Sequence, residues 1–253
     1  IDQRSPARHP DWMGPDDLAL KVQELRELTD NQVPIQLKIG ASRVYDDVRM
    51  AAKCDPDSIF LDCMEGSTAA GPHIAAANTG IPGIAAVREA RRALDDVGKS
   101  GEVSLVFAGG IRDGADMAKA IALGADAIAI GTAGLVALNC NKDIPEADYE
   151  KEMGVEAGYC YHCHTGRCPV GVATQDPVLR SRLDPTEAAD RVYNLLSTMT
   201  LECQMLARAC GKTNIHSLEP EDLAALTMES SAMAKVPLAG TDLTVGVDNY
   251  HSI

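Results

Sequence analysis

Short apolar segments that alternate with helical segments constrain the fold of this chain most strongly. Strand-like runs rich in β-branched residues occupy residues 34–39, 58–62, 103–108 and 127–130. Apolar residues at helical spacing fall within residues 11–29, 44–53, 84–97 and 113–123. Because buried parallel strands read as short continuous apolar runs separated by helices, the pattern predicts a parallel sheet built from βα units.

The number of strands bears on which architecture these units build. Four clear strands are present, whereas a closed (β/α)8 barrel needs eight. Four parallel strands could instead form a small doubly wound sheet. The chain also starts at Ile1 without an initiator Met, so we expect an α/β fold that is the C-terminal half of a (β/α)8 TIM barrel within a longer polypeptide. A Cys-rich loop follows, and then a helical C-terminal segment with a strong helix start at Asp184-Pro185.

Charge and composition limit the class of partner. The net charge of −14 and the aromatic content of 4% argue against a nucleic-acid partner, which needs a basic surface. No segment approaches the ~18 consecutive apolar residues of a membrane span. The start has no apolar signal core, so the eight cysteines point away from a disulfide scaffold and toward a reducing compartment. We expect a cytoplasmic protein with no membrane and no nucleic-acid partner.

Two glycine turns end the last two predicted strands. Gly109-Gly110 follows residues 103–108, and Gly131-Thr132 follows residues 127–130. Glycine lets the backbone approach a ligand closely and point N–H groups at an anion. In phosphate-binding barrels the loops after the last two strands form this site. A tight βα turn without a ligand is the alternative, but the second turn favours phosphate binding at Gly109, Gly110, Gly131 and Thr132.

Lys38 lies near the end of a predicted strand that is otherwise apolar, close to Gly40. A lysine at the C-terminal end of a barrel strand points into the active site and is costly to bury unpaired. A flavin favours a cation beside its N1–C2 carbonyl edge, where negative charge grows on reduction. A partly exposed lysine at a strand end is the alternative interpretation.

A cysteine-rich loop carries the most specific signal in the chain. Cys160, Cys163 and Cys168 lie close together in sequence, and Pro169 follows the last of them. This spacing favours an iron–sulfur cluster, because thiolates so near in sequence can converge on one cluster and a proline recurs after the last ligand. Zinc is the competing interpretation, since histidines lie nearby at positions 162 and 164. A second zinc-ligand pair at the usual distance is missing, and redox thiols prefer the start of a helix.

These motifs together resemble the FMN and iron–sulfur domain of glutamate synthases. The resemblance rests on the cluster loop at residues 163–176, the last two barrel strands at 107–112 and 124–132, and the segment 135–140 that leads into the first cluster cysteine. It implies that the domain binds FMN and a 3Fe–4S cluster, and that Lys38 is the catalytic lysine beside the flavin. Residues 65–72 resemble the family's glycine-rich active-site loop, which adds Gly66 and Ser67 as cofactor-binding residues.

The chain departs from the family's cluster pattern at one cysteine. The family has the spacing C-x5-C-x4-C, and Cys163 and Cys168 match its second and third positions. The first position falls on Ala157, which cannot bind iron. We therefore expect Cys160 as the third ligand, with Cys140 as the alternative across an insertion. If both bind iron, the cluster is a 4Fe–4S type.

The opening residues 1–6 and the segments 210–212 and 218–223 resemble the C subunit of methylamine–glutamate N-methyltransferase, also called N-methylglutamate synthase. This implies formation of N-methylglutamate from glutamate and methylamine through 2-iminoglutarate. A ferredoxin- or NAD(P)H-dependent glutamate synthase subunit that aminates 2-oxoglutarate is the first alternative, and a non-catalytic zinc-bearing scaffold is the second. The implied partners are amidotransferase-like and further synthase-like subunits and the missing N-terminal barrel half. We expect the half-barrel at residues 1–139, the insertion and cluster loop at 140–176, and the helical extension and tail at 177–253.

Overall fold

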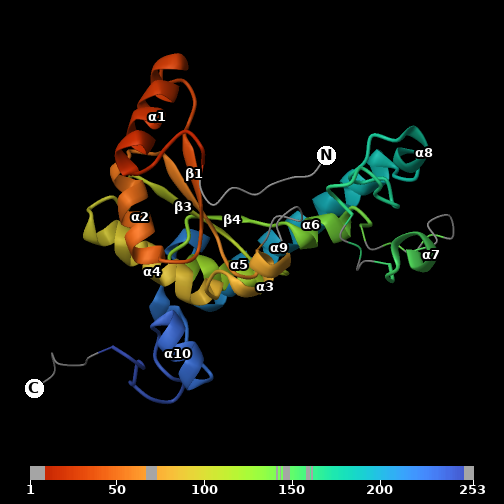
Figure 1. The fold of residues 1–253 in the computed structure, drawn as a ribbon. Coiled ribbons are helices and arrows are strands. Elements are labelled where there is room, and N and C mark those ends of the chain that lie inside the picture. The colour runs from red at the N-terminus through yellow and green to blue at the C-terminus, as the bar shows by residue number, and fades with distance from the viewer. Residues whose placement is uncertain are drawn as a thin grey trace, which may run out of the picture.

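The computed structural model of the chain contains one parallel sheet. It describes residues 9–66, 73–140, 142, 144, 149–157, 160 and 162–247. The strands are β1 (Gln36–Gly40), β2 (Ser58–Asp62), β3 (Ser104–Ala108) and β4 (Ala127–Ala129), and they lie side by side in chain order (Figure 1). A doubly wound sheet would reverse its strand order at a switch point. The uninterrupted order confirms the expected half of a β/α barrel.

The two faces of the sheet differ in burial because side chains alternate along each strand. On one face Ile59, Leu61 and Leu105 are fully buried beneath α2 (Val44–Lys53) and α4 (Gly83–Asp96), whose apolar residues belong to the same core. The strand register places Lys38 beside Phe60 on the opposite face, where the side chains are only partly buried or exposed. In a closed barrel this open face is the interior.

The remaining helices before the cysteine segment follow the expected βα order. They are α1 (Pro15–Leu28), α3 (His73–Asn78), α5 (Gly114–Ala122) and α6 (Thr132–Ala137). Predicted helices and strands in this region agree with the structure to within a few residues at each end, and α2 and β2 have the expected bounds. The sequence had suggested neither α3 nor α6, since each has only six residues and too few turns for a periodic signal.

Partly exposed acidic side chains bind backbone N–H groups at the edge of the sheet where the strands begin. Asp57 accepts a hydrogen bond from the backbone N–H of Ile35 at 2.6 Å, and Asp126 accepts one from Leu105 at 2.7 Å. Arg91 on α4 pairs with Asp126 at 2.7 Å. These contacts fix the strand starts, which leaves the opposite edge, where the strands end, for ligands.

The C-terminal part of the chain extends from the sheet and then returns to it. The helices α7 (Tyr149–Met153) and α8 (Pro177–Arg180) lie to one side of the sheet, and α9 (Pro185–Ala209) runs from them back to α5 (Figure 1). Asp184 caps α9 as predicted, by accepting hydrogen bonds from the N–H groups of Thr186 and Glu187. Two short 3₁₀ turns (Ile215–Ser217 and Pro220–Asp222) and α10 (Met228–Ala234) follow. None of the described helices is long and apolar enough to span a bilayer.

Candidate functional site

The carboxyl ends of the four strands gather most of the residues singled out from the sequence. Lys38 is on β1, Gly66 follows β2, Gly109-Gly110 follows β3 and Gly131-Thr132 follows β4. Neighbouring parallel strands end at one edge of a sheet, so the observed strand order brings these residues to a common edge. Ser67 lies outside the described residues.

Lys38 is held on the open face of the sheet by an acidic partner. Its Nζ lies 2.9 Å from Oδ2 of Asp62 and 5.0 Å from the centre of the Phe60 ring. The Lys38 side chain keeps 55% of its surface exposed, whereas that of Asp62 keeps 19%. The ammonium group is thus oriented by a more buried carboxylate and by a ring face, and it remains accessible to a ligand on the open side of the sheet.

The Gly109-Gly110 turn requires glycine at both positions. Gly109 has φ +137° and Gly110 has φ +69°, values that L side chains rarely adopt. A Cβ atom on Gly110 would lie 3.2 Å from Cβ of Glu65, and one on Gly109 would lie 3.1 Å from Cβ of Cys63. The Glu65 carboxylate itself accepts hydrogen bonds from the Gly83 N–H at 3.0 and 3.1 Å. The turn therefore packs closely on the segment that follows β2.

The backbone donors at this edge are available to an anion. The N–H groups of Gly109, Gly110, Gly131 and Thr132 donate to no acceptor within the described part of the chain. Gly131 is the N-cap of α6 and Thr132 its first residue, so the helix dipole adds a favourable potential there.

The neighbouring start of α5 has the opposite character. Asp113 accepts a hydrogen bond from the Asp116 N–H at 2.9 Å, and Asp116 accepts one from the Arg112 N–H at 3.2 Å. Glu202 accepts one from the Gly114 N–H at 2.8 Å. Three carboxylates thus occupy this helix start, and their charge disfavours a phosphate. The N–H groups of the glycine turns and of Thr132, by contrast, donate to no carboxylate among the described residues.

Asp62 and Glu65 belong to this edge although the sequence analysis did not include them among the candidate residues. The signal for Asp62 was available, because it ends a predicted strand two residues after Phe60 and so shares the face of that side chain. No comparable signal marks Glu65, whose contacts with Gly83 and Gly110 depend on the folded positions of distant segments.

Cys63 lies beside these carboxylates but is not a candidate nucleophile. Burial raises the pKa of its thiol to about 12, and the charges of Glu65 and Asp62 contribute to the increase. The thiolate is the reactive form of cysteine, so Cys63 stays protonated and packs as a small apolar side chain.

The structure brings Cys140 toward the cysteine loop. Asn139 follows the C-cap of α6 with φ +68°. Cys140 then donates its N–H to the carbonyl of Leu135 at 2.9 Å, the pattern of a Schellman motif. Burial raises the pKa of Cys140, and interactions with Cys163, Cys160 and Cys168 raise it further.

Cys140 thus lies near enough to the three cysteines of the loop to interact with them electrostatically. Of these three, Cys168 is buried and Cys163 is exposed. They are not arranged as a formed site, since no group of three or more His, Cys, Asp or Glu residues in the described ranges is placed to hold a metal ion. Cys160 and Cys140 both stay candidates for the third ligand.

A hydrogen-bonded scaffold shapes the loop that carries Cys163 and Cys168. Thr174 donates its hydroxyl to the carbonyl of Gly166 at 2.5 Å, which draws the loop into a closed turn. Arg182 donates to the carbonyl of Pro169 at 2.7 Å. A Cβ on Gly171 would lie 2.5 Å from the carbonyl oxygen of Leu179, so the loop packs directly on α8.

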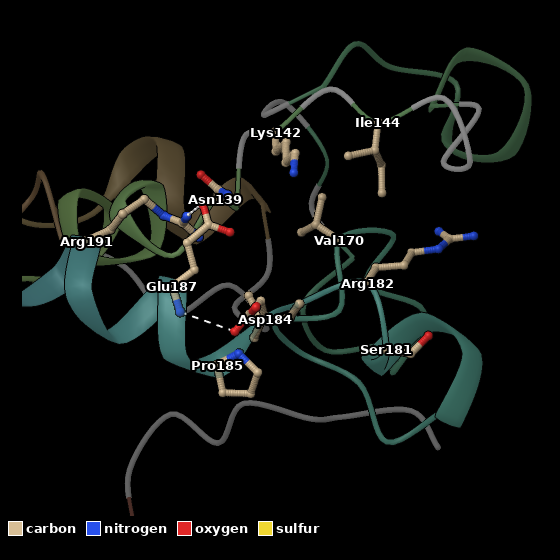
Figure 2. Close-up of a pocket in the computed structure, with 11 residues that line it drawn as sticks. Asn139, Lys142, Ile144, Val170, Ser181, Arg182, Asp184, Pro185, Glu187 and Arg191 are labelled. Carbon is tan, nitrogen blue, oxygen red and sulfur yellow. Dashed lines mark hydrogen bonds and ion pairs between the residues drawn. The ribbon is translucent and has the colours of Figure 1, made fainter.

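A cavity of about 510 Å³ borders this loop, and the sequence had given no sign of it. Figure 2 shows cationic and anionic side chains around it, with Val170 of the cysteine loop on its wall. Arg191 pairs with Glu187 and donates to the carbonyl of Ala137 at 2.9 Å. The charged residues that line the cavity are Lys142, Arg182, Asp184, Glu187 and Arg191.

The chain is similar in sequence to glutamate synthases. Residues 1–147 and 149–213 match the profile of a conserved region in glutamate synthase. The chain is 55% identical to a glutamate synthase large subunit-like protein of Rhizobium meliloti, over 99% of this chain and 56% of that protein. It is 38% identical to an archaeal glutamate synthase (NADPH) of Methanocaldococcus jannaschii, over 86% of this chain and 39% of that protein.

The chain thus spans about half or less of the length of these relatives. Among solved structures, a variant of flavocytochrome b2 with sulfite bound is similar, with a TM-score of 0.50 and 20% identity over 80% of this chain and 37% of that one. That likeness concerns the fold alone and agrees with a partial barrel.

Proposed function

The chain belongs to the glutamate synthase family, and on that premise we propose that it is part of a catalytic subunit that binds FMN and an iron–sulfur cluster. The proposed reaction forms N-methylglutamate from glutamate and methylamine. One observation carries the proposal: unpaired backbone donors of two glycine turns lie at the same sheet edge as the oriented cation Lys38.

Gly109, Gly110, Gly131 and Thr132 would hold the FMN phosphate through their N–H groups. Support comes from their free donors and from the carboxylates that make the start of α5 unsuitable for an anion. Charge-assisted bonds from backbone N–H groups to phosphate are stronger than neutral ones. Gly66 fits the same edge as a further cofactor contact, and Ser67 is retained from the family resemblance.

Lys38 would stabilise negative charge on the flavin edge and help to orient the substrate carboxylate. Its pairing with Asp62 at 2.9 Å holds the ammonium group in place before substrate binds. A preorganised charge stabilises a transition state because little reorganisation is needed when charge develops. Asp62 would keep this cation oriented, and the 55% exposure of the Lys38 side chain leaves room for the ligand.

The chemistry balances without an external electron donor. Bound FMN would supply hydride acceptance from Cα of glutamate and hydride return to an imine carbon. Loss of hydride and a proton from glutamate gives 2-iminoglutarate, and methylamine then replaces ammonia at the imine carbon. Return of the hydride to this carbon and of a proton to the nitrogen yields N-methylglutamate. The net conversion is glutamate plus methylamine to N-methylglutamate plus ammonia. Lys38 would bind the carboxylate and position Cα during both hydride steps.

The proposed cluster is of the 3Fe–4S type, held by Cys160, Cys163 and Cys168. If Cys140 is an additional ligand, the cluster would be of the 4Fe–4S type. Thiolates are the ligands that iron–sulfur clusters use. The electrostatic interactions of Cys140 and Cys160 with Cys163 and Cys168 support a shared centre. α6 spans roughly 9 Å between Thr132 and the segment that leads to Cys140, which would bring the cluster near the flavin phosphate.

A second candidate function is amination of 2-oxoglutarate to glutamate, with reducing equivalents delivered through the cluster. The names of relatives from Methanocaldococcus jannaschii and Archaeoglobus fulgidus, both archaeal glutamate synthases (NADPH), favour it. In either case the chain would act with amidotransferase-like and synthase-like subunits and with a polypeptide that completes the barrel, in the cytoplasm. The chain covers only about half of the length of its relative from Rhizobium meliloti, which supports a further polypeptide part that completes the barrel.

The absorbance spectrum and metal content of the purified native complex test the proposal against a zinc-bearing scaffold. Flavin bands with a broad iron–sulfur shoulder, together with stoichiometric FMN and iron, are expected. A colourless complex that contains zinc and no iron would contradict the proposal.

A further inference from the structure

Glu202 on α9 reaches across the fold to the backbone of the helix that follows β3. Its Oε2 accepts a hydrogen bond from the Gly114 N–H at 2.8 Å, between residues separated by 88 positions in the sequence. Gly114 is the first residue of α5 and is buried. A bond between an ionised carboxylate and a partly buried N–H is stronger than a neutral one, so this contact fixes the start of α5 on α9.

The packing around this contact leaves no room for a side chain between the two helices. A Cβ on Gly114 would lie 2.3 Å from the carbonyl oxygen of Met199 and 2.8 Å from the backbone nitrogen of Cys203. Both α9 residues are buried, with 2% and 0% of their surface exposed. Backbone atoms of α9 thus lie directly against the first turn of α5.

The short connection from Gly110 to Gly114 is anchored by one buried side chain and by hydrogen bonds to Asp116. Ile111 is 8% exposed and belongs to the main core. Asp116 accepts hydrogen bonds from both the N–H and Nε of Arg112, at 3.2 and 2.9 Å. Four residues span at most roughly 14 Å, so the position of Gly114 limits where the Gly109-Gly110 turn can lie.

The same helix also holds the element that follows β4. Arg191 of α9 donates to the carbonyl of Ala137 at 2.9 Å, at the end of the helix that begins at Thr132. α9 therefore contacts both helices that start from the glycine turns.

We infer that Glu202 is a positioning residue that holds the Gly109-Gly110 turn in register for the phosphate of the flavin. The inference deepens the proposed function and rests on it. Glu202 would not touch the cofactor, and its effect would pass through Gly114 to the turn.

FMN and riboflavin distinguish this role from a general structural one, because riboflavin lacks the phosphate. Glu202→Ala is prepared in the native complex and compared with Glu202→Gln, whose amide oxygen can still accept the Gly114 N–H. Asp190→Ala is the matched control, since Asp190 is exposed on the same helix and makes no hydrogen bond or ion pair among the described residues. Flavin-free protein is titrated with each flavin, and thermal unfolding is followed in parallel.

Glu202→Ala is expected to weaken FMN binding by ~10-fold, because a displaced turn would lose about one charge-assisted hydrogen bond to the phosphate. Riboflavin binding is expected to change less than about twofold. Glu202→Gln and Asp190→Ala are expected to bind both flavins as the unaltered protein does. If Glu202→Ala does not fold, Glu202→Asp provides the same comparison with a shorter side chain.

Equal weakening of both flavins, or no change in FMN affinity, would overturn the role of Glu202 and leave the proposed function intact. Failure of the unaltered complex to bind FMN would overturn both.

Discussion

Replacement of Gly110 by valine perturbs the Gly109-Gly110 turn, the proposed phosphate site, at a position where a side chain is strained. Gly110 has φ +69°, and a Cβ there would lie 3.2 Å from Cβ and 3.3 Å from Cγ of Glu65. A β-branched residue is a genuine outlier in the left-handed region. Glu65 is itself bonded to the Gly83 N–H, so it resists displacement. The turn must therefore shift to accommodate the new side chain.

The substitution is expected to lower both the folding stability and the affinity for FMN. The left-handed backbone costs roughly 1–3 kcal/mol of folding stability for a non-glycine residue. A shifted turn would also lose the proposed N–H contacts of Gly109 and Gly110 to the phosphate, at roughly 1.5 kcal/mol or more for each charged hydrogen bond. Two such bonds correspond to a loss of FMN affinity of ~100-fold or more.

Gly98 provides a matched control for the stability cost of a side chain in the left-handed backbone conformation. It has φ +68°, and a Cβ there would meet no atom within 4 Å. Gly98 follows α4, at the opposite edge of the sheet from the glycine turns. Gly98→Val should lose similar stability while it keeps FMN.

Fluorescence titration with FMN, thermal unfolding and the electron paramagnetic resonance signal of the cluster are measured on both variants of the native complex. Gly110→Val is expected to lose FMN and keep the iron–sulfur signal. Stoichiometric FMN in Gly110→Val would refute the placement of the phosphate.

Three further predictions concern single side chains. Lys38→Met should keep FMN but slow its reduction by glutamate by ~100-fold or more, as expected when a preorganised charge is lost; near-normal stopped-flow rates would mean that Lys38 is only structural. Cys160→Ser should lose the cluster, as measured by iron content and by electron paramagnetic resonance. If Cys160→Ser keeps an intact cluster and Cys140→Ser loses it, the third ligand is Cys140. Cys63, whose pKa is raised to about 12, should resist iodoacetamide near pH 8 while exposed Cys210 reacts; rapid labelling of Cys63 in mass spectra would contradict its burial.

Local sequence patterns were sufficient for the elements whose stability is local or periodic. The bounds of β2 follow from its apolar run, those of α2 from its amphipathic spacing, and the start of α9 from the cap at Asp184 and the proline after it. The half-barrel order could be expected because each strand is followed by its own helix. The turns at Gly109-Gly110 and Gly131 could be located because glycine directly after an apolar strand marks a βα turn. Their binding of a phosphate stays a prediction.

The contacts that complete the site could not be predicted in this way. Glu202 and Gly114 are 88 residues apart, and nothing near either residue marks the other as its partner. Glu65 reaches Gly83 only after β2 and α4 have packed. Cys140 is a further example of a contact that sequence spacing does not reveal. Its distance along the chain disfavours it as a ligand, but after the Schellman motif at the end of α6 it interacts electrostatically with the other cysteines.

Product analysis in the native complex tests the central claim most directly. The complex receives glutamate labelled with deuterium at Cα and methylamine, with no external electron donor, and a parallel reaction receives 2-oxoglutarate, ammonia and a reduced donor. We expect N-methylglutamate and an equal amount of ammonia in the first reaction, formed only while FMN is bound. Product confined to the second reaction would assign the chain to reductive amination of 2-oxoglutarate, and no product in either reaction from a folded, FMN-loaded complex would contradict a catalytic role.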